Sequence, residues 1–211
     1  MILRNFVVFE GIDGTGTTTQ IERLKSAYAL RQGENQNLIH FTCEPTSGEI
    51  GRLIRRALRG EIHFTPDTMA RLFSADRGEH LFGENGIESL IAQGKAVFSD
   101  RYLFSSLAYQ GEAGNPDLPL LLNGNFPLPE YLFYFDLDED TAMSRVEKRA
   151  GSLEIYEKRD FQNKVRSRYL EIIERFEHEE KNMKVTRIDA SSSIDEIAEK
   201  IWSIARNLPK M

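Results

Sequence analysis

The sequence predicts an α/β protein with a three-layer α/β/α architecture, in which a five-stranded parallel sheet lies between two layers of helices. Two observations predict this fold. Short runs rich in β-branched and aromatic residues alternate with segments of helical periodicity, which is the element order of a doubly wound parallel sheet. Most of these runs are almost continuously apolar, as expected for strands that are covered on both faces. The 211 residues suit one domain with a full core, and we expect residues 1–211 to form it.

The expected elements follow from periodicity and from local start signals. The predicted strands are residues 6–9, 38–41, 96–99, 131–135 and 184–188. The predicted helices are residues 18–31, 49–58, 66–93, 141–149, 160–180 and 194–208. The segment 66–93 is either one long helix or two helices with a break near residues 83–86. Ser193 and Glu196 form the pattern of a capping box, which places the start of the last helix at Ile194.

Composition restricts the class of partner. The formal net charge is −6, and a broadly acidic surface argues against a protein that coats nucleic acid. Any bound phosphate must therefore be held by loops and a few basic side chains. Cys43 is the only cysteine, which excludes an internal disulfide and fits a reducing compartment. The first residues lack the apolar core of a signal peptide, and no apolar run is long enough to span a bilayer, so we expect no membrane partner.

A glycine-rich loop follows the first predicted strand. Residues 10–20 read EGIDGTGTTTQ and match the phosphate-binding pattern G-x-x-x-x-G-K-[ST], except that Thr17 stands in place of the lysine. The glycines allow backbone N–H groups to converge on phosphate oxygens, and the following helix directs its positive end at them. The residues expected to bind ATP are Gly11, Gly14, Thr15, Gly16, Thr17, Thr18 and Thr19. A glycine-rich turn without a ligand is the alternative, but the flanking strand and helix favour a P-loop NTPase-type fold.

Two loop positions decide how the chemistry could work. Thr18 offers a hydroxyl to Mg²⁺, the ion that accompanies ATP. The lysine that is missing at Thr17 normally neutralises the β- and γ-phosphates in the transition state. Losing such a contact can cost several kcal/mol of barrier, or roughly a hundredfold in rate. Either another cation replaces the lysine or catalysis is weak.

Segments spread along essentially the whole chain resemble the thymidylate kinase family. They read FEGIDG at 9–14, EPT at 44–46, GEIGR at 48–52, LFSADR at 72–77, DRY at 100–102 and SSLAYQG at 105–111, in the family's order. Each motif alone could arise by chance, but together and in register they are a specific signal. The resemblance implies a cytoplasmic enzyme, commonly a homodimer, that transfers a phosphoryl group from ATP to dTMP with Mg²⁺ and yields ADP and dTDP.

Three residues are candidates for catalysis around the loop. Asp100 and Arg101 leave the third predicted strand at the end that faces the phosphate loop. Asp100, with Thr18, can organise Mg²⁺ and its waters, and Arg101 can hold a monophosphate with a forked pair of hydrogen bonds. A surface ion pair is the alternative. The resemblance implies that Asp13 contacts the acceptor side and positions dTMP; it need not act as a base, because the acceptor is already a phosphate anion.

Two pairs of residues are candidates for the pyrimidine. Phe73 and Arg77 are four apart, so they share a helix face on which the ring can stack on a base and the arginine can donate to thymine O4. Phe73 alone would more simply be a core residue. Ser106 and Gln110 are also four apart and can address the base edge from the facing helix.

Other positions follow from the resemblance or stay open. The resemblance implies that Tyr109 lies beside the sugar and disfavours a 2′-hydroxyl, and that Tyr156, with the glutamate after it, leans over the nucleotide. Glu44 either orients Arg101 and the metal waters or is structural. Four arginines form a basic stretch in and directly after the predicted helix 49–58: Arg52, Arg55, Arg56 and Arg59. We interpret it as a solvated face from which one side chain could reach the acceptor phosphate.

Residues 145–158 have the position and charge of a lid that closes over ATP. Thymidylate kinases carry a catalytic arginine either in the phosphate loop or in the lid, and residues 12–15 hold no basic side chain. Ile155 stands where many members have the lid arginine, so both usual cations are missing. Lys148 and Arg149 are the preferred catalytic replacements. Further candidates are Arg145, Lys158 and Arg159.

Two alternatives to a dTMP kinase stay open at this level. The absence of both usual cations allows a degenerate nucleotide-binding protein with little kinase activity. The same chemistry could also serve another acceptor, such as dUMP.

Overall fold

The computed structural model contains a five-stranded sheet in which all neighbouring strands are parallel. It describes residues 1–31, 37–149, 156 and 159–210, apart from the side chains of residues 31 and 149. The strands are β1 (Ile2–Gly11), β2 (Ile39–Cys43), β3 (Ala96–Asp100), β4 (Leu128–Asp136) and β5 (Lys184–Asp189). Their order in the sheet is β2-β3-β1-β4-β5. The predicted parallel sheet is confirmed, and each observed strand overlaps its predicted run.

The predicted helices are confirmed with shifts of a few residues at their ends. The described helices are α1 (Thr17–Arg31), α2 (Glu49–Leu58), α3 (Pro66–Phe82), α4 (Ile87–Ala92), α5 (Leu103–Ser105), the π-helix η2 (Ser106–Gln110), α6 (Gly111–Ala113), α7 (Asp117–Asn123), α8 (Glu139–Arg149), α9 (Arg159–Glu179) and α10 (Ile194–Ala205). The segment 66–93 consists of two helices, which confirms the predicted alternative with a break near residues 83–86. A side-chain Cβ at Gly86 would lie 2.6 Å from the carbonyl oxygen of Leu81, so the chain can pass this close only with glycine.

Local signals explain where two helices begin. The Ser193 hydroxyl accepts a hydrogen bond from the backbone N–H of Glu196, and the Glu196 carboxylate accepts one from the backbone of Ser193, so the predicted capping box is confirmed. The Thr65 hydroxyl caps α3 by accepting a hydrogen bond from the backbone N–H of Thr68, with Pro66 at the first helical position. The short helices between residues 103 and 123 had no predicted bounds, because each is too short to show a helical period.

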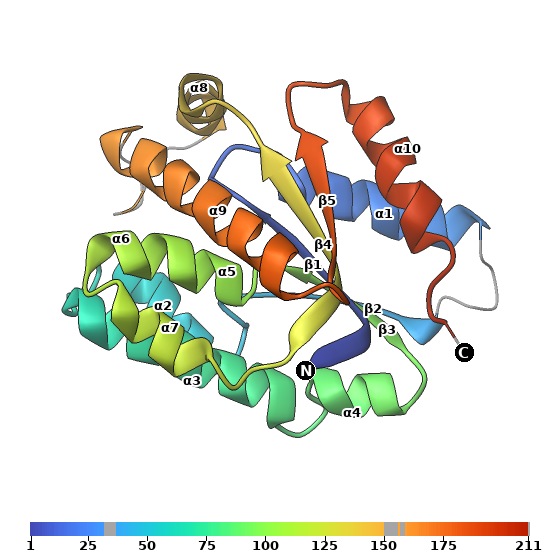
Figure 1. The fold of residues 1–211 in the computed structure, drawn as a ribbon, viewed down its shortest axis with the longest axis horizontal. Helices are drawn as coiled ribbons and strands as arrows, with labels where there is room; N and C mark the ends of the chain where they lie inside the picture. The colour runs from blue at the N-terminus through green and yellow to red at the C-terminus, as the bar shows by residue number, and fades with distance from the viewer. Residues whose placement is uncertain (32–36, 150–155, 157–158, 211) are drawn as a thin grey trace.

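Helices cover both faces of the sheet (Figure 1). Helices α1 and α10 pack together on one face, while α9, α5 and α4 contact the other, with α3 packed outside α4 and η2. This is the expected three-layer arrangement. Within the described part of the chain, no helix combines the length and apolar character that crossing a membrane requires.

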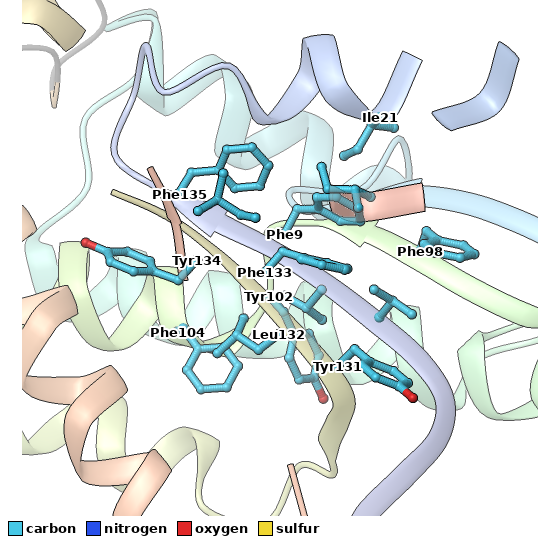
Figure 2. Close-up of a cluster of buried hydrophobic side chains, with 14 of the residues drawn as sticks. Phe9, Ile21, Phe98, Tyr102, Phe104, Tyr131, Leu132, Phe133, Tyr134 and Phe135 are labelled. Carbon is cyan, nitrogen blue, oxygen red and sulfur yellow. The ribbon is translucent and has the colours of Figure 1, made fainter. Parts of the chain in front are cut away.

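Side chains of the central strands alternate between the two layers. Phe9 and Phe135 point to one side of β1 and β4, whereas Tyr134 points to the other (Figure 2). The Phe9 ring is 6.1 Å from that of Phe135, and the Tyr134 ring is 5.5 Å from that of Tyr169 on α9. Aromatic contacts therefore join neighbouring strands to one another and the sheet to α9, which holds the carboxyl ends of these strands in place.

Candidate active site

A cavity of about 490 Å³ lies at the carboxyl ends of β1, β2 and β3. This is where ligands bind in open parallel sheets. The cavity brings together eight of the predicted site residues: Asp13, Thr18, Phe73, Asp100, Arg101, Tyr109, Gln110 and Tyr156. Two predicted residues, Arg77 and Ser106, lie behind its wall and are buried.

The phosphate loop has the backbone shape that its glycines predicted. Gly14 and Gly16 have φ of +88° and +92°, in the left-handed region that favours glycine. A Cβ at Gly14 would lie 2.2 Å from the carbonyl oxygen of Ala142 on α8, so a side chain there would push α8 away from the loop. A Cβ at Gly16 would meet nothing within 4 Å, so this part of the loop is open to a ligand. Helix α1 begins directly after it, at Thr17, and the loop therefore fits a polyphosphate.

Thr15 closes the loop from inside. Its side chain is buried, and its hydroxyl donates to the carbonyl oxygen of Ile12 across 2.8 Å. Gly11 is equally confined, because a Cβ there would lie 2.8 Å from the carbonyl oxygen of Phe135 on β4. Thr17 and Thr19 lie in the first turn of α1, with Thr19 exposed. The loop is therefore rigid on its sheet side and open on the side where α1 begins.

Two oxygen ligands meet beside the loop. The Thr18 hydroxyl donates to the Asp100 carboxylate across 2.9 Å, joining the start of α1 to the end of β3. Hydroxyl and carboxylate oxygens suit Mg²⁺, which usually takes one or two protein ligands and completes its shell with water and phosphate. The described residues contain no group of three His, Cys, Asp or Glu side chains that could form a closed metal cage. The donor set therefore fits an ion that arrives with a nucleotide.

Arg101 occupies the centre of the cleft. Its φ is +71°, and its backbone N–H donates to the carbonyl oxygen of Phe9, so the chain turns sharply as it leaves β3. The guanidinium donates to the Asp13 carboxylate across 2.5 Å and to the carbonyl oxygen of Gly11 across 3.2 Å. It also lies 5.2 Å from the centre of the Tyr109 ring. The ion pair thus lies inside the cleft against the phosphate loop, not on the outer surface.

Gln162 is a site residue that sequence analysis missed. It is fully buried, and its amide donates to the Asp13 carboxylate and to the Tyr156 carbonyl oxygen, each across 2.8 Å. The Tyr109 hydroxyl donates to the Asp13 carboxylate across 3.2 Å and lies 3.4 Å from the Gln162 carbonyl oxygen. Burial, with the nearby Asp13 charge, raises the pKa of Tyr109, which keeps it a neutral donor. A single glutamine in a helix carries no pattern from which this role could be predicted.

Phe73 and Arg77 do not share the cleft as expected. Phe73 lines it, but Arg77 is 1% exposed and donates to the Glu44 carboxylate across 2.6 Å. The Arg77 guanidinium also donates to the Ser106 hydroxyl across 3.1 Å and to the side chain of Asn123. Arg77 therefore forms part of the cleft wall, behind the residues that line the cavity, in this structure.

Ser106 and Gln110 are likewise separated. Ser106 contacts Arg77 behind the wall, whereas Gln110 lines the cavity and hydrogen bonds with the Tyr156 side chain. Both lie in η2, and π-helical turns occur frequently at functional sites.

Glu44 does not contact Arg101 in this structure. One carboxylate oxygen accepts from Arg77, and the other lies 3.0 Å from Nδ1 of His80. His80 Nε2 in turn lies 2.7 Å from the Thr42 hydroxyl. Of the two earlier interpretations of Glu44, the structural one agrees with these contacts.

Two cations of the cleft come from helices next to it. Among the four arginines near α2, Arg55 lines the cavity, and its guanidinium donates to the carbonyl oxygen of Pro45. The others pair with carboxylates: Arg52 with Glu49, and Arg56 and Arg59 with Glu61. Lys25 on α1 also lines the cavity and pairs with Glu22 across 2.6 Å; sequence analysis missed it, because it lies beyond the loop motif.

Part of the predicted lid can be placed. Lys148 is exposed near the end of α8, and both terminal nitrogens of Arg145 lie 3.3 Å from the carbonyl oxygen of Ala190. Arg159 pairs with Asp140. The side chain of Arg149, and Ile155 and Lys158 as a whole, lie outside the described residues.

Comparison with known proteins shows what the chain is similar to. The family model described as thymidylate kinase matches residues 9–201. A Treponema pallidum protein is 45% identical over 200 residues, which cover 95% of this chain and 94% of the relative. Relatives from Sulfolobus acidocaldarius and Methanocaldococcus jannaschii are 36% and 32% identical, over 94% and 99% of this chain and 94% and 100% of their own lengths. All three are named thymidylate kinases, each with a qualifier that marks the name as provisional.

Proposed function

The chain belongs to the thymidylate kinase family, and from this membership we propose that its cleft transfers the γ-phosphoryl group of ATP to dTMP, giving ADP and dTDP. The observation that carries the proposal is the position of the Arg101–Asp13 pair. It lies against the phosphate loop through the carbonyl oxygen of Gly11, and it faces the same cavity as Phe73 and Gln110. One cleft can therefore hold a donor tail and an acceptor monophosphate side by side.

The proposed transfer needs alignment more than proton chemistry. An oxygen of the dTMP phosphate forms a bond to the γ-phosphorus while the bond from that phosphorus to the β–γ bridging oxygen breaks, and the electron pair leaves with ADP. Because the acceptor oxygen is already anionic, no base has to remove a proton. Arg101 would hold the acceptor phosphate with its two terminal nitrogens, and Asp13 would fix the direction of that fork.

In this proposal the phosphate loop binds ATP, the phosphoryl donor. Backbone N–H groups from Gly14 to Thr18 would surround the phosphates at the start of α1. Thr18 and Asp100 would hold Mg²⁺ when it is bound with ATP, and the ion would supply positive charge to the phosphate oxygens.

Acceptor recognition would come from the opposite wall. Phe73 offers an aromatic face to the pyrimidine, and Gln110 and Tyr156 lie on the same cavity. Tyr109 would lie beside the sugar, where its ring already contacts the Arg101 guanidinium. Arg77, whose guanidinium donates to both Glu44 and Ser106, would support this wall and reach thymine O4 once the base is bound.

The missing lysine at position 17 requires a substitute in this scheme. We assign that part to Lys148 and Arg149, because Gly14 packs against Ala142 and thereby ties α8 to the phosphate loop. The carbonyl oxygen of Ala190 already engages Arg145 in the same helix, and Asp140 and Glu147 pair with Arg159. Among the described residues, Lys148 has no hydrogen-bond or ion-pair partner of this kind.

A coupled assay of ADP formation with purified protein, Mg²⁺ and ATP tests the function. We expect kcat/KM for dTMP to exceed the values for dUMP and dCMP, since Phe73 and the base-edge residues would face the ring positions at which these three pyrimidines differ. Turnover with dTMP no faster than ATP hydrolysis alone would exclude a dTMP kinase, and the same result with dUMP and dCMP would exclude a kinase for these acceptors. Calorimetric binding of ATP and dTMP without turnover would then identify a nucleotide-binding protein.

The resemblance also implies a homodimer in the cytoplasm, and we include both in the proposal. Light scattering of the purified chain measures the first directly. A mass of one chain at micromolar concentration would contradict the dimer.

A further inference from the structure

Glu10 is a buried carboxylate at the end of β1 that none of the proposed steps uses. Its side chain follows Phe6 and Val8 on the face of β1 that packs under α5 and α9, and all three are 0% exposed. An ionisable group at such a position is costly, and an apolar residue would pack the fold at lower cost. Its presence here therefore calls for a reason beyond the core.

The carboxylate of Glu10 accepts four hydrogen bonds. One oxygen accepts from the backbone N–H groups of Tyr102 and Ser105, across 2.8 and 3.2 Å. The other accepts from the hydroxyls of Ser105 and Tyr169, across 2.6 and 2.7 Å. Each of the first three donors belongs to the turn that carries Arg101 out of β3.

This network reaches Arg101 by two routes. The Tyr102 N–H belongs to the peptide that directly follows Arg101, whose φ of +71° is unusual for a residue with a side chain. The Ser105 hydroxyl donates to Glu10 and accepts from the Arg101 guanidinium across 3.2 Å. Glu10 therefore holds both the backbone turn and one arm of the guanidinium, while Asp13 holds the other arm.

We propose that Glu10 is the positioning residue of Arg101, which sets the guanidinium fork for the acceptor phosphate through Ser105 and the Tyr102 peptide. The proposal rests on the proposed function, because it takes Arg101 to be the group that holds dTMP. A fork that is rotated away from the phosphate loses its second hydrogen bond. A defect in Glu10 should therefore weaken acceptor binding and alignment, and leave ATP binding by the amides of residues 14–18, with which the Glu10 side chain makes no hydrogen bond, almost unchanged.

The test compares Glu10→Gln with Glu130→Gln. Glu130 is also a buried carboxylate on a central strand, at the opposite end of the sheet, where it accepts from the backbone of Asn5 and from Lys210. For Glu10→Gln we expect KM for dTMP to rise roughly tenfold or more, with KM for ATP within about twofold of wild type. Glu130→Gln should lower Tm without changing either KM. Unchanged kinetic constants in a folded Glu10→Gln protein would overturn the proposal, as would an equal rise in both KM values.

Ser105→Ala provides a second route if Glu10→Gln does not fold. It removes the hydroxyl between Glu10 and Arg101 and leaves the carboxylate in place. We expect the same selective rise in KM for dTMP, and a double variant no worse than the more severe single variant by more than about threefold. Effects that multiply in the double variant would overturn the proposal. Wild-type protein without dTMP turnover would instead contradict the proposed function, while dTMP binding by calorimetry would still report on Glu10.

Discussion

The guanidinium of Arg101 and the carboxylate of Asp13 form a 2.5 Å ion pair that joins the end of β3 to the phosphate loop. Each side chain is 24% exposed, so the pair is open to the cleft on one side only. The other terminal nitrogen of Arg101 donates to the carbonyl oxygen of Gly11 and to the hydroxyl of Ser105. The geometry of the cleft centre thus depends on a planar group that can serve several acceptors at once.

Arg101→Lys should therefore behave as a severe change. An ammonium keeps the charge but cannot contact Asp13, Gly11 and a phosphate oxygen in one plane. We expect kcat/KM for dTMP to fall by about a hundredfold, which corresponds to the loss of roughly 3 kcal/mol of transition-state binding. Steady-state kinetics measures it, with Arg56→Lys on the outer side of α2 as the control. A decrease of less than threefold would contradict the role of the fork.

Gln162→Leu should loosen the acceptor side without removing a charge. The substitution deletes the donor to Asp13 and to the Tyr156 carbonyl oxygen while keeping a similar volume. Since both acceptors lose a buried partner, we expect the free energy of unfolding to fall by about 2 kcal/mol and KM for dTMP to rise. Urea unfolding and kinetics measure the two effects. Asn163→Leu, at an exposed position of the same helix, should change neither.

Glu44→Gln should destabilise the part of the cleft wall that contains Arg77. Arg77 and Glu44 are 1% and 3% exposed, and removing one charge leaves the guanidinium buried without its counter-charge. We expect a loss of about 3 kcal/mol in the free energy of unfolding. Glu61→Gln, which removes the partner of two exposed arginines, should cost far less, because water screens exposed ion pairs. Similar losses in the two variants would show that the buried pair contributes no more to stability than the exposed one.

Glu10 should give the protein a pH-dependent stability near neutrality. Burial raises the pKa of Glu10 from 4.5 to about 7, against the hydrogen bonds from Ser105, Tyr169 and Tyr102 and the attraction of Arg101. The folded state therefore holds this proton more tightly than the unfolded state, and the stabilisation is complete below pH 4.5 and lost as the pH rises to about 7. Tyr134 on β4 faces the same carboxylate and stays neutral over this range, since its own pKa is raised by burial.

The measurement is the stability difference between wild type and Glu10→Gln as a function of pH. The wild-type advantage should shrink by on the order of 3 kcal/mol between pH 4.5 and 7 and then stay level, since the variant cannot release the proton. Urea unfolding at each pH gives the two curves. A difference that stays constant over this range would mean that the pKa of Glu10 is not raised in the folded protein.

The fold was predictable from sequence because its signals are local. Buried parallel strands are continuous apolar runs. The glycines at 11, 14 and 16 indicate a tight loop, and the observed positive φ values and close backbone approaches explain why glycine is needed there. The residues of the loop and of the strand ends were predictable for the same reason. The contacts of Arg77, Gln162 and Glu10 were not, because each depends on a partner at least 29 positions away, which no periodicity encodes.

The threonine at position 17 leads to the sharpest test of the catalytic scheme. The proposal assigns the missing positive charge to Lys148 and Arg149, so a Lys148→Ala, Arg149→Ala double variant should lose about a hundredfold in kcat, because the γ-phosphate then lacks a side-chain cation from α8. Adding Thr17→Lys to that variant should restore at least about tenfold, since a lysine at the start of α1 reaches the same phosphates. Arg175→Ala, which removes a surface cation paired with Glu179, is the control. An unchanged kcat in the double variant would show that neither α8 cation takes the place of the lysine.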